Sequence, residues 1–141
     1  DHITDCICNI GYTGPDGMAC SACDLGEYKP ANGSTPCFSC EAGTYLNGTA
    51  GSACLSCPSN TYSLVGSDHI TDCICNIGYT GPDGMACSAC DLGEYKPANG
   101  STPCFSCEAG TYLNGTAGSA CLSCPSNTYS LVGSDHITDC I

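Results

Sequence analysis

Apolar residues occur singly or in pairs along this chain, and turn-forming residues separate them at short intervals. The pieces between the turns are short, as at 26–29 (GEYK), 43–46 (GTYL) and 60–64 (NTYSL). The intervening stretches at 31–36, 46–51, 65–68 and 80–84 contain Asn-Gly, Pro-Asp-Gly or related sequences, which are strong turn signals. No window keeps a helical period over three turns. The pattern therefore predicts short two-stranded β-hairpins and irregular loops, with almost no helix.

The chain is also internally repetitive, with a period of 67 residues. Residues 68–134 repeat residues 1–67 without one substitution, and residues 135–141 begin a third copy. We therefore predict cysteine-rich repeats at 1–67 and 68–134, followed by the start of a third. A recently homogenised array, a designed tandem or an averaged sequence would each give identical copies, and under all three we expect the repeat to continue beyond this chain.

Each copy contains four shorter segments, at 24–40, 41–57, 58–75 and 76–90. Every segment has Gly or Asn at its third position, then one Tyr, and closes on two cysteines separated by one or two residues. Gly and Asn tolerate left-handed backbone, so we expect the chain to reverse direction there. We expect each Tyr ring to lie over a neighbouring disulfide. The third-position residues are Gly26, Gly43, Asn60 and Gly78, and the tyrosines are Tyr28, Tyr45, Tyr62 and Tyr79.

The composition is poor in core-forming side chains and rich in cysteine. The chain has 141 residues with 17 cysteines, 2 Phe, 2 Met and no Trp. Such a chain needs covalent or metal cross-links to fold, and this density of cysteine is typical of disulfide scaffolds. Because disulfides persist in oxidising compartments, we predict an extracellular location, secreted or at the cell surface.

The charge balance excludes several classes of partner. Acidic residues number 14 and basic residues 2, for a formal net charge of −12. Binding to nucleic acid or to an anionic membrane needs Lys and Arg, so we predict neither. The sequence has no stretch of about 20 apolar residues and no secretory leader is visible, so we expect no membrane insertion within this segment. We expect the acidic surface to keep the array soluble.

The cysteine spacing resembles that of a known family. C-x-x-C-x-x-G-x-Y, a turn, another C-x-x-C and then C-x-C-x-x-G-Y resemble the ephrin-receptor-like cysteine-rich repeat, whose relatives include EGF-like and tumour-necrosis-factor-receptor-like modules. The resemblance covers nearly the whole chain. It implies a small disulfide-rich fold of tandem modules forming an elongated extracellular rod, and it is specific for the fold rather than for function.

The resemblance also implies disulfide pairs. The stretch 8–20 resembles the closing loop of an EGF-like domain, which implies Cys8–Cys20 and Cys75–Cys87. Extending the EGF pattern upstream gives Cys40–Cys57 and Cys54–Cys73, leaving Cys23–Cys37, whereas a rival ladder joins Cys40–Cys54 and Cys57–Cys73. Both schemes leave Cys6 for a partner in a preceding copy. The corresponding cysteines of the second copy are Cys90, Cys104, Cys107, Cys121, Cys124 and Cys140.

The sequence evidence for a metal site or for catalysis is weaker. The spacing of Cys20, Cys23, Cys37 and Cys40 also fits a zinc ribbon, but the scarcity of Lys and Arg and the Cys-x-Cys pair favour disulfides. We expect His2, His69 and His136 to be loop residues facing solvent. The acidic residues Asp1, Asp5 and Asp16 do not follow the calcium-binding EGF pattern. Because no nucleophile elbow, phosphate loop or H-E-x-x-H motif is present, we predict no metal, no cofactor and no enzyme activity.

Four asparagines lie in N-glycosylation sequons, all at expected hairpin tips. They are Asn32, Asn47, Asn99 and Asn114. In a secreted array they would place covalent glycans at a fixed period.

Two functions fit these observations. The first is a structural repeat segment of an extracellular rod or filament, in which neighbouring repeats of the same chain are the main partners and lateral self-association forms a fibril. The second is the ectodomain stalk of a receptor or adhesin that acts as a protein-binding module. Identical copies and periodic sequons favour the first.

Overall fold

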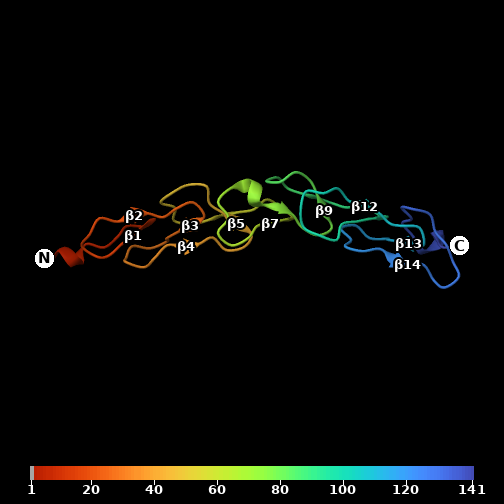
Figure 1. Cartoon of the computed structure of the whole chain (residues 1–141), viewed down its shortest axis with the longest axis horizontal. Helices are drawn as coiled ribbons and strands as arrows, with labels where there is room; N and C mark the ends of the chain where they lie inside the picture. Colours follow the sequence, from red (N-terminus) through yellow and green to blue (C-terminus); the bar gives the residue numbers. More distant parts are fainter. Residues whose placement is uncertain (1) are drawn as a thin grey trace. The chain divides into compact units, whose positions relative to one another are not determined.

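The fold is built from two-residue strands that pair into hairpins between turns. A computed structural model describes residues 2–141 (Figure 1). Over that range the strands form seven two-stranded sheets, and the helical content is three 3-10 turns of three residues each. The prediction of a small disulfide-rich fold of short hairpins with almost no helix is confirmed.

The chain divides into two compact units. The first comprises the residues through Cys57 together with Tyr62–Cys73, and the second comprises Pro58–Thr61 together with Ile74–Ile141. The segment between Cys57 and Ile74 is therefore divided between the two units. One boundary falls inside β7 (Thr61–Tyr62), with Thr61 in the second unit and Tyr62 in the first.

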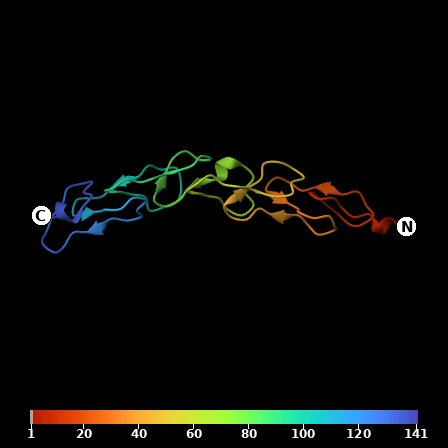
Figure 2. The same cartoon turned by 180° about the vertical axis from the view of Figure 1, so that it is seen from behind.

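Within the first unit, hairpins follow one another in chain order (Figures 1 and 2). Strand β1 pairs with β2, β3 with β4, and β5 with β6. The elements are η1 (Ile3–Asp5), β1 (Tyr12–Thr13), β2 (Ser21–Ala22), β3 (Glu27–Tyr28), β4 (Phe38–Ser39), β5 (Thr44–Tyr45), β6 (Leu55–Ser56) and η2 (Ile70–Asp72).

The second unit repeats these hairpins. Strand β9 pairs with β10, β11 with β12, and β13 with β14, while β8 pairs with β7. The elements are β8 (Ile74–Cys75), β9 (Tyr79–Thr80), β10 (Ser88–Ala89), β11 (Glu94–Tyr95), β12 (Phe105–Ser106), β13 (Thr111–Tyr112), β14 (Leu122–Ser123) and η3 (Ile137–Asp139).

In two of the four segments, cross-strand register places the Tyr opposite a large apolar side chain. In β3–β4, Tyr28 lies opposite Phe38, with ring centroids 5.8 Å apart. In β5–β6, Tyr45 lies opposite Leu55 and is buried. Such cross-strand pairs stabilise a hairpin by a few tenths to about 1 kcal/mol, which is too little to hold a two-residue strand pair without a cross-link.

Sulfur makes up most of the interior. Among residues 2–141, eight of the eleven buried apolar residues are cysteines, and the other three are Tyr45, Tyr112 and Leu113. Many large apolar side chains remain exposed, including Leu64 and Val65. Burial of hydrocarbon is therefore a minor contribution, as the composition predicts. No helix in the part of the chain that is described is long and apolar enough to cross a membrane.

Candidate functional site: the hairpin junctions and the sequon loops

Each hairpin is cross-linked by one disulfide. The two copies carry the same four pairings, with Cα atoms 5.7–5.8 Å apart. Each disulfide closes a loop of about 15 residues. In the chain-entropy model, such a bond stabilises the folded state by about 3 kcal/mol because it restricts the unfolded chain. The pairs are Cys8–Cys20, Cys23–Cys37, Cys40–Cys54, Cys57–Cys73, Cys75–Cys87, Cys90–Cys104, Cys107–Cys121 and Cys124–Cys140.

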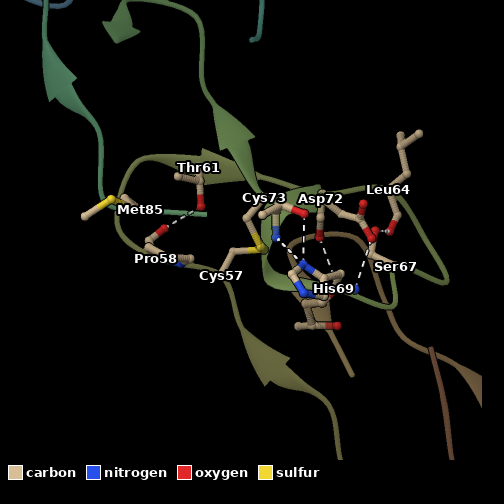
Figure 3. The surroundings of a disulfide bond; sticks show 12 residues. Cys57, Pro58, Thr61, Leu64, Ser67, His69, Asp72, Cys73 and Met85 are labelled. Atoms are coloured by element: carbon tan, nitrogen blue, oxygen red, sulfur yellow. Dashed lines mark hydrogen bonds between the residues drawn. A yellow bond between two sulfur atoms is a disulfide. The ribbon is translucent and has the colours of Figure 1, made fainter. Parts of the chain in front are cut away.

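The structure therefore has the rival ladder and not the crossed EGF-like pairing. Cys40 is bonded to Cys54, so the alternative bond from Cys40 to Cys57 is wrong. In this hairpin Tyr45 lies opposite Leu55, and the N–H of Cys57 donates to the carbonyl of Gly43 (3.0 Å). Cys57 is left for Cys73 (Figure 3).

The cysteines of the zinc-ribbon spacing are all used in these bonds. Cys20, Cys23, Cys37 and Cys40 belong to three different disulfides. Across residues 2–141, no group of three or more His, Cys, Asp or Glu side chains is arranged to hold a metal ion. Cys6 is a free, exposed thiol in this chain.

Successive hairpins are joined by backbone hydrogen bonds that recur in both copies. At the second junction the N–H of Gly26 donates to the carbonyl of Leu46 (2.8 Å), and the N–H of Ala50 donates to the carbonyl of Cys23 (3.0 Å). The same bonds in the second copy join Gly93 to Leu113 at 2.9 Å and Ala117 to Cys90 at 3.0 Å. The third-position glycine and the cysteine carbonyl of one hairpin thus bind the next hairpin.

The third-position residues that make these bonds have left-handed backbone. Gly26, Gly43 and Gly78 have φ of 74°, 84° and 83°, and Asn60 has φ of 63°. The predicted chain reversal is therefore confirmed at all four positions. Asn60 differs in adding a side-chain bond, because its Nδ2 donates to the carbonyl of Cys87 (3.1 Å).

Both lysines of the chain are buried at junctions. Lys29 is 0 % exposed, and its Nζ donates to the carbonyls of Tyr12 (2.8 Å) and Gly33 (2.5 Å). Lys96 is 1 % exposed and makes the equivalent bonds to Tyr79 and Gly100. Burial lowers the pKa of Lys96, with a smaller opposing effect from the carboxylate of Asp83.

Sequence reasoning missed this burial, although a signal was available. Lys29 directly follows the Tyr of its segment, as Leu46 and Ser63 do in the next two segments. All three positions lie between hairpins: Ser63 Oγ donates to the carbonyl of Thr44 (3.0 Å), as the Lys29 Nζ donates to Tyr12. The position after the Tyr is therefore a junction position. Lys29 buries its aliphatic chain there, and its ammonium group is hydrogen-bonded to backbone carbonyls.

The three histidines are exposed, as expected, and each also caps a 3-10 turn. His69 Nδ1 accepts from the backbone N–H of Thr71 (3.2 Å), while the Asp72 carboxylate accepts from the backbone N–H of His69 (3.1 Å), beside the Cys57–Cys73 disulfide (Figure 3). His2 and His136 make the equivalent bonds. In the first turn, the backbone N–H of His2 lowers the pKa of the Asp5 carboxyl.

The two sequons of each copy differ in their contacts. Asn32 is exposed, but its Oδ1 accepts from the backbone N–H of Ile10 (2.9 Å), and the following Gly33 donates its N–H to Cys8 (2.8 Å). Asn99 and Gly100 repeat both bonds. Within residues 2–141, the side chains of Asn47 and Asn114 make no hydrogen bond.

These features define a class: a cysteine-rich ladder of short hairpins, with one disulfide closing each. The family model described as tyrosine-protein kinase ephrin type A/B receptor-like matches residues 31–73 and 98–140. The two matches together cover more than half of the chain, and the chain belongs to this family. Its modules are typically extracellular and are generally not enzymes. No curated protein matches the chain at a significant level.

Proposed function

We propose that the chain is a structural repeat segment of an extracellular filament or cell-surface appendage. One observation carries this proposal: the three junctions between hairpins inside each copy have the same backbone bonds in both copies, as in Gly43–Ser63 and Gly110–Ser130. Backbone contacts at glycine and cysteine positions do not depend on variable side chains, so the same junction serves every copy. Oxidised sulfur then provides the stability that a hydrophobic core provides elsewhere.

The surface chemistry supports the same role. The two lysines are buried, and the acidic residues leave a strongly negative surface that keeps closely spaced copies apart. Glycans on Asn32, Asn47, Asn99 and Asn114 would add a periodic coat over the exposed apolar side chains. Neighbouring repeats of the same chain are the main partners in this proposal.

A second candidate is a receptor or adhesin stalk that binds another protein. It is favoured by the adjacent side chains of Leu64 and Val65, which are 69 % and 67 % exposed and recur as Leu131 and Val132. Exposed apolar pairs of this kind mark contact surfaces when they gather into a patch.

Electron microscopy of the native material separates the two candidates. An antibody raised against the oxidised repeat should label uniform filaments at a regular axial spacing. Labelling of single membrane-tethered particles with a bound second protein would overturn the filament proposal and support the stalk. Recovery of the label only inside the cell would contradict both.

A further inference from the structure

The chain has four Asn-Gly pairs, one in each sequon, and their folded surroundings form two classes. The pairs are Asn32-Gly33, Asn47-Gly48, Asn99-Gly100 and Asn114-Gly115. Asn-Gly is the dipeptide in which a backbone nitrogen most readily reaches the preceding side-chain amide, because glycine has no Cβ to obstruct it. The dipeptide is the same in all four cases, so any difference in reactivity comes from the fold.

At Asn32 and Asn99, both groups that would react with each other are hydrogen-bonded elsewhere in the fold. The nucleophile would be the nitrogen of Gly33, whose N–H donates to the carbonyl of Cys8 (2.8 Å). The electrophile would be the Cγ of Asn32, whose Oδ1 accepts from Ile10 N–H (2.9 Å). Ring closure requires both bonds to break. The second copy repeats the arrangement at Asn99 and Gly100.

At Asn47 and Asn114 neither group is held. Within residues 2–141, the N–H of Gly48 and the side chain of Asn47 have no hydrogen-bond partner, and the same is true of Gly115 and Asn114. Asn47 is exposed. Crowding does not distinguish the classes, because a Cβ placed on Gly33 or on Gly48 would meet nothing within 4 Å.

We propose that Asn47 and Asn114 are sites of spontaneous deamidation, and that the fold protects Asn32 and Asn99. The Gly48 nitrogen attacks the Asn47 Cγ, a new N–C bond forms, and the bond from Cγ to the side-chain nitrogen breaks. The side-chain nitrogen leaves as ammonia and takes up the proton that Gly48 loses. Water then adds to one carbonyl of the five-membered imide, the bond from that carbon to the Gly48 nitrogen breaks, and the nitrogen regains a proton from the water. Opening at Cγ gives aspartate, and opening at the backbone carbonyl carbon gives isoaspartate. No oxidant or cofactor is needed, and each event adds one negative charge.

Two hydrogen bonds must break before Asn32 can react, and each contributes a modest net free energy. We therefore expect deamidation at Asn32 to be slower than at Asn47 by roughly tenfold or more. The experiment uses the oxidised full chain made without glycosylation, incubated at pH 8 and 37 °C. Peptide mapping follows the mass gain of about 1 Da and the aspartate–isoaspartate mixture that identifies the imide. Peptides from 47 and 114 have the same sequence and report together, as do those from 32 and 99.

The reduced, denatured chain is the internal control, because both classes should then react at similar rates. Gly48→Ala together with Gly115→Ala should suppress the reaction at Asn47 and Asn114. Equal rates at the two classes in the folded chain, or faster reaction at Asn32, would overturn the proposal. These outcomes do not depend on whether the chain forms a filament.

Discussion

The third-position glycine of one hairpin, Gly26, lies directly against the carbonyl oxygen of Gly66, which is 40 positions further along the chain and two hairpins away. A Cβ added to Gly26 would overlap that oxygen. Gly11 has the same relationship to Ala50, and Gly93 to Gly133. The hairpins that begin with these glycines are therefore in contact with the turn of the next hairpin but one, and glycine is required for this close approach.

We predict that Gly26→Ala with Gly93→Ala destabilises the chain much more than Gly43→Ala with Gly110→Ala. All four glycines have positive φ, so both double variants carry the backbone cost of about 1–2 kcal/mol per residue. Only the first pair also meets a carbonyl, because Gly43 and Gly110 face open space. The added steric cost is about 1–3 kcal/mol per site.

Hydrogen exchange at the Gly66 and Gly133 amides measures this difference, since both donate across the junction to Cys40 and Cys107. Substituting both copies keeps their peptides equivalent. Similar loss of protection in the two double variants would show that the contact contributes nothing.

The disulfide ladder can be tested by digestion at acid pH, where thiols do not exchange. Cleavage after Leu55 separates Cys54 from Cys57. The ladder predicts that the Cys40–Cys54 pair and the Cys57–Cys73 pair are then released as separate fragments. A single cross-linked fragment holding all four cysteines would instead support the EGF-like crossed pairing.

Lys96 should make stability depend on alkaline pH. Its pKa is lowered by burial, so between that value and the ordinary lysine pKa the unfolded chain binds more protons than the folded chain. The free energy of unfolding therefore rises with pH through this window and levels off above the ordinary lysine pKa. The Lys96→Met variant should lack this rise.

Denaturant unfolding at several pH values measures the effect as the difference between the parent and Lys96→Met. Both chains should carry Cys6→Ser, because Cys6 is a free thiol that would attack disulfides at alkaline pH. A difference that stays constant with pH would show that Lys96 titrates normally.

Glycosylation and deamidation should compete at Asn47. A glycan on Nδ2 blocks the departure of ammonia, so material from a glycosylating host should keep Asn47 intact wherever the glycan is present. Thr49→Ala with Thr116→Ala removes the sequon but keeps Asn-Gly. We expect this variant to deamidate at Asn47 in the same host. An unglycosylated Asn47 in the parent would contradict the glycan prediction without affecting the imide chemistry.

The local structure could be predicted from the sequence because it depends on short-range signals. Gly and Asn at the third position fixed the chain reversals, and Asn-Gly with Pro-Asp-Gly fixed the turns. Disulfide pairing could not be chosen, because Cys54 and Cys57 are only three residues apart and their spacing from Cys40 and Cys73 fits both schemes. The junction bonds were not predicted, because they join backbone groups 18–27 residues apart in the chain.

Lysine burial has a final consequence for the resistance of the chain to proteases. The only basic residues are Lys29 and Lys96, each is followed by proline, and both are enclosed by carbonyl groups. Trypsin-like proteases, which cut after accessible lysine or arginine and are obstructed by a following proline, therefore find no usable site anywhere in the repeat. Because the two copies are identical around their lysines, the second copy offers such enzymes no more of a site than the first.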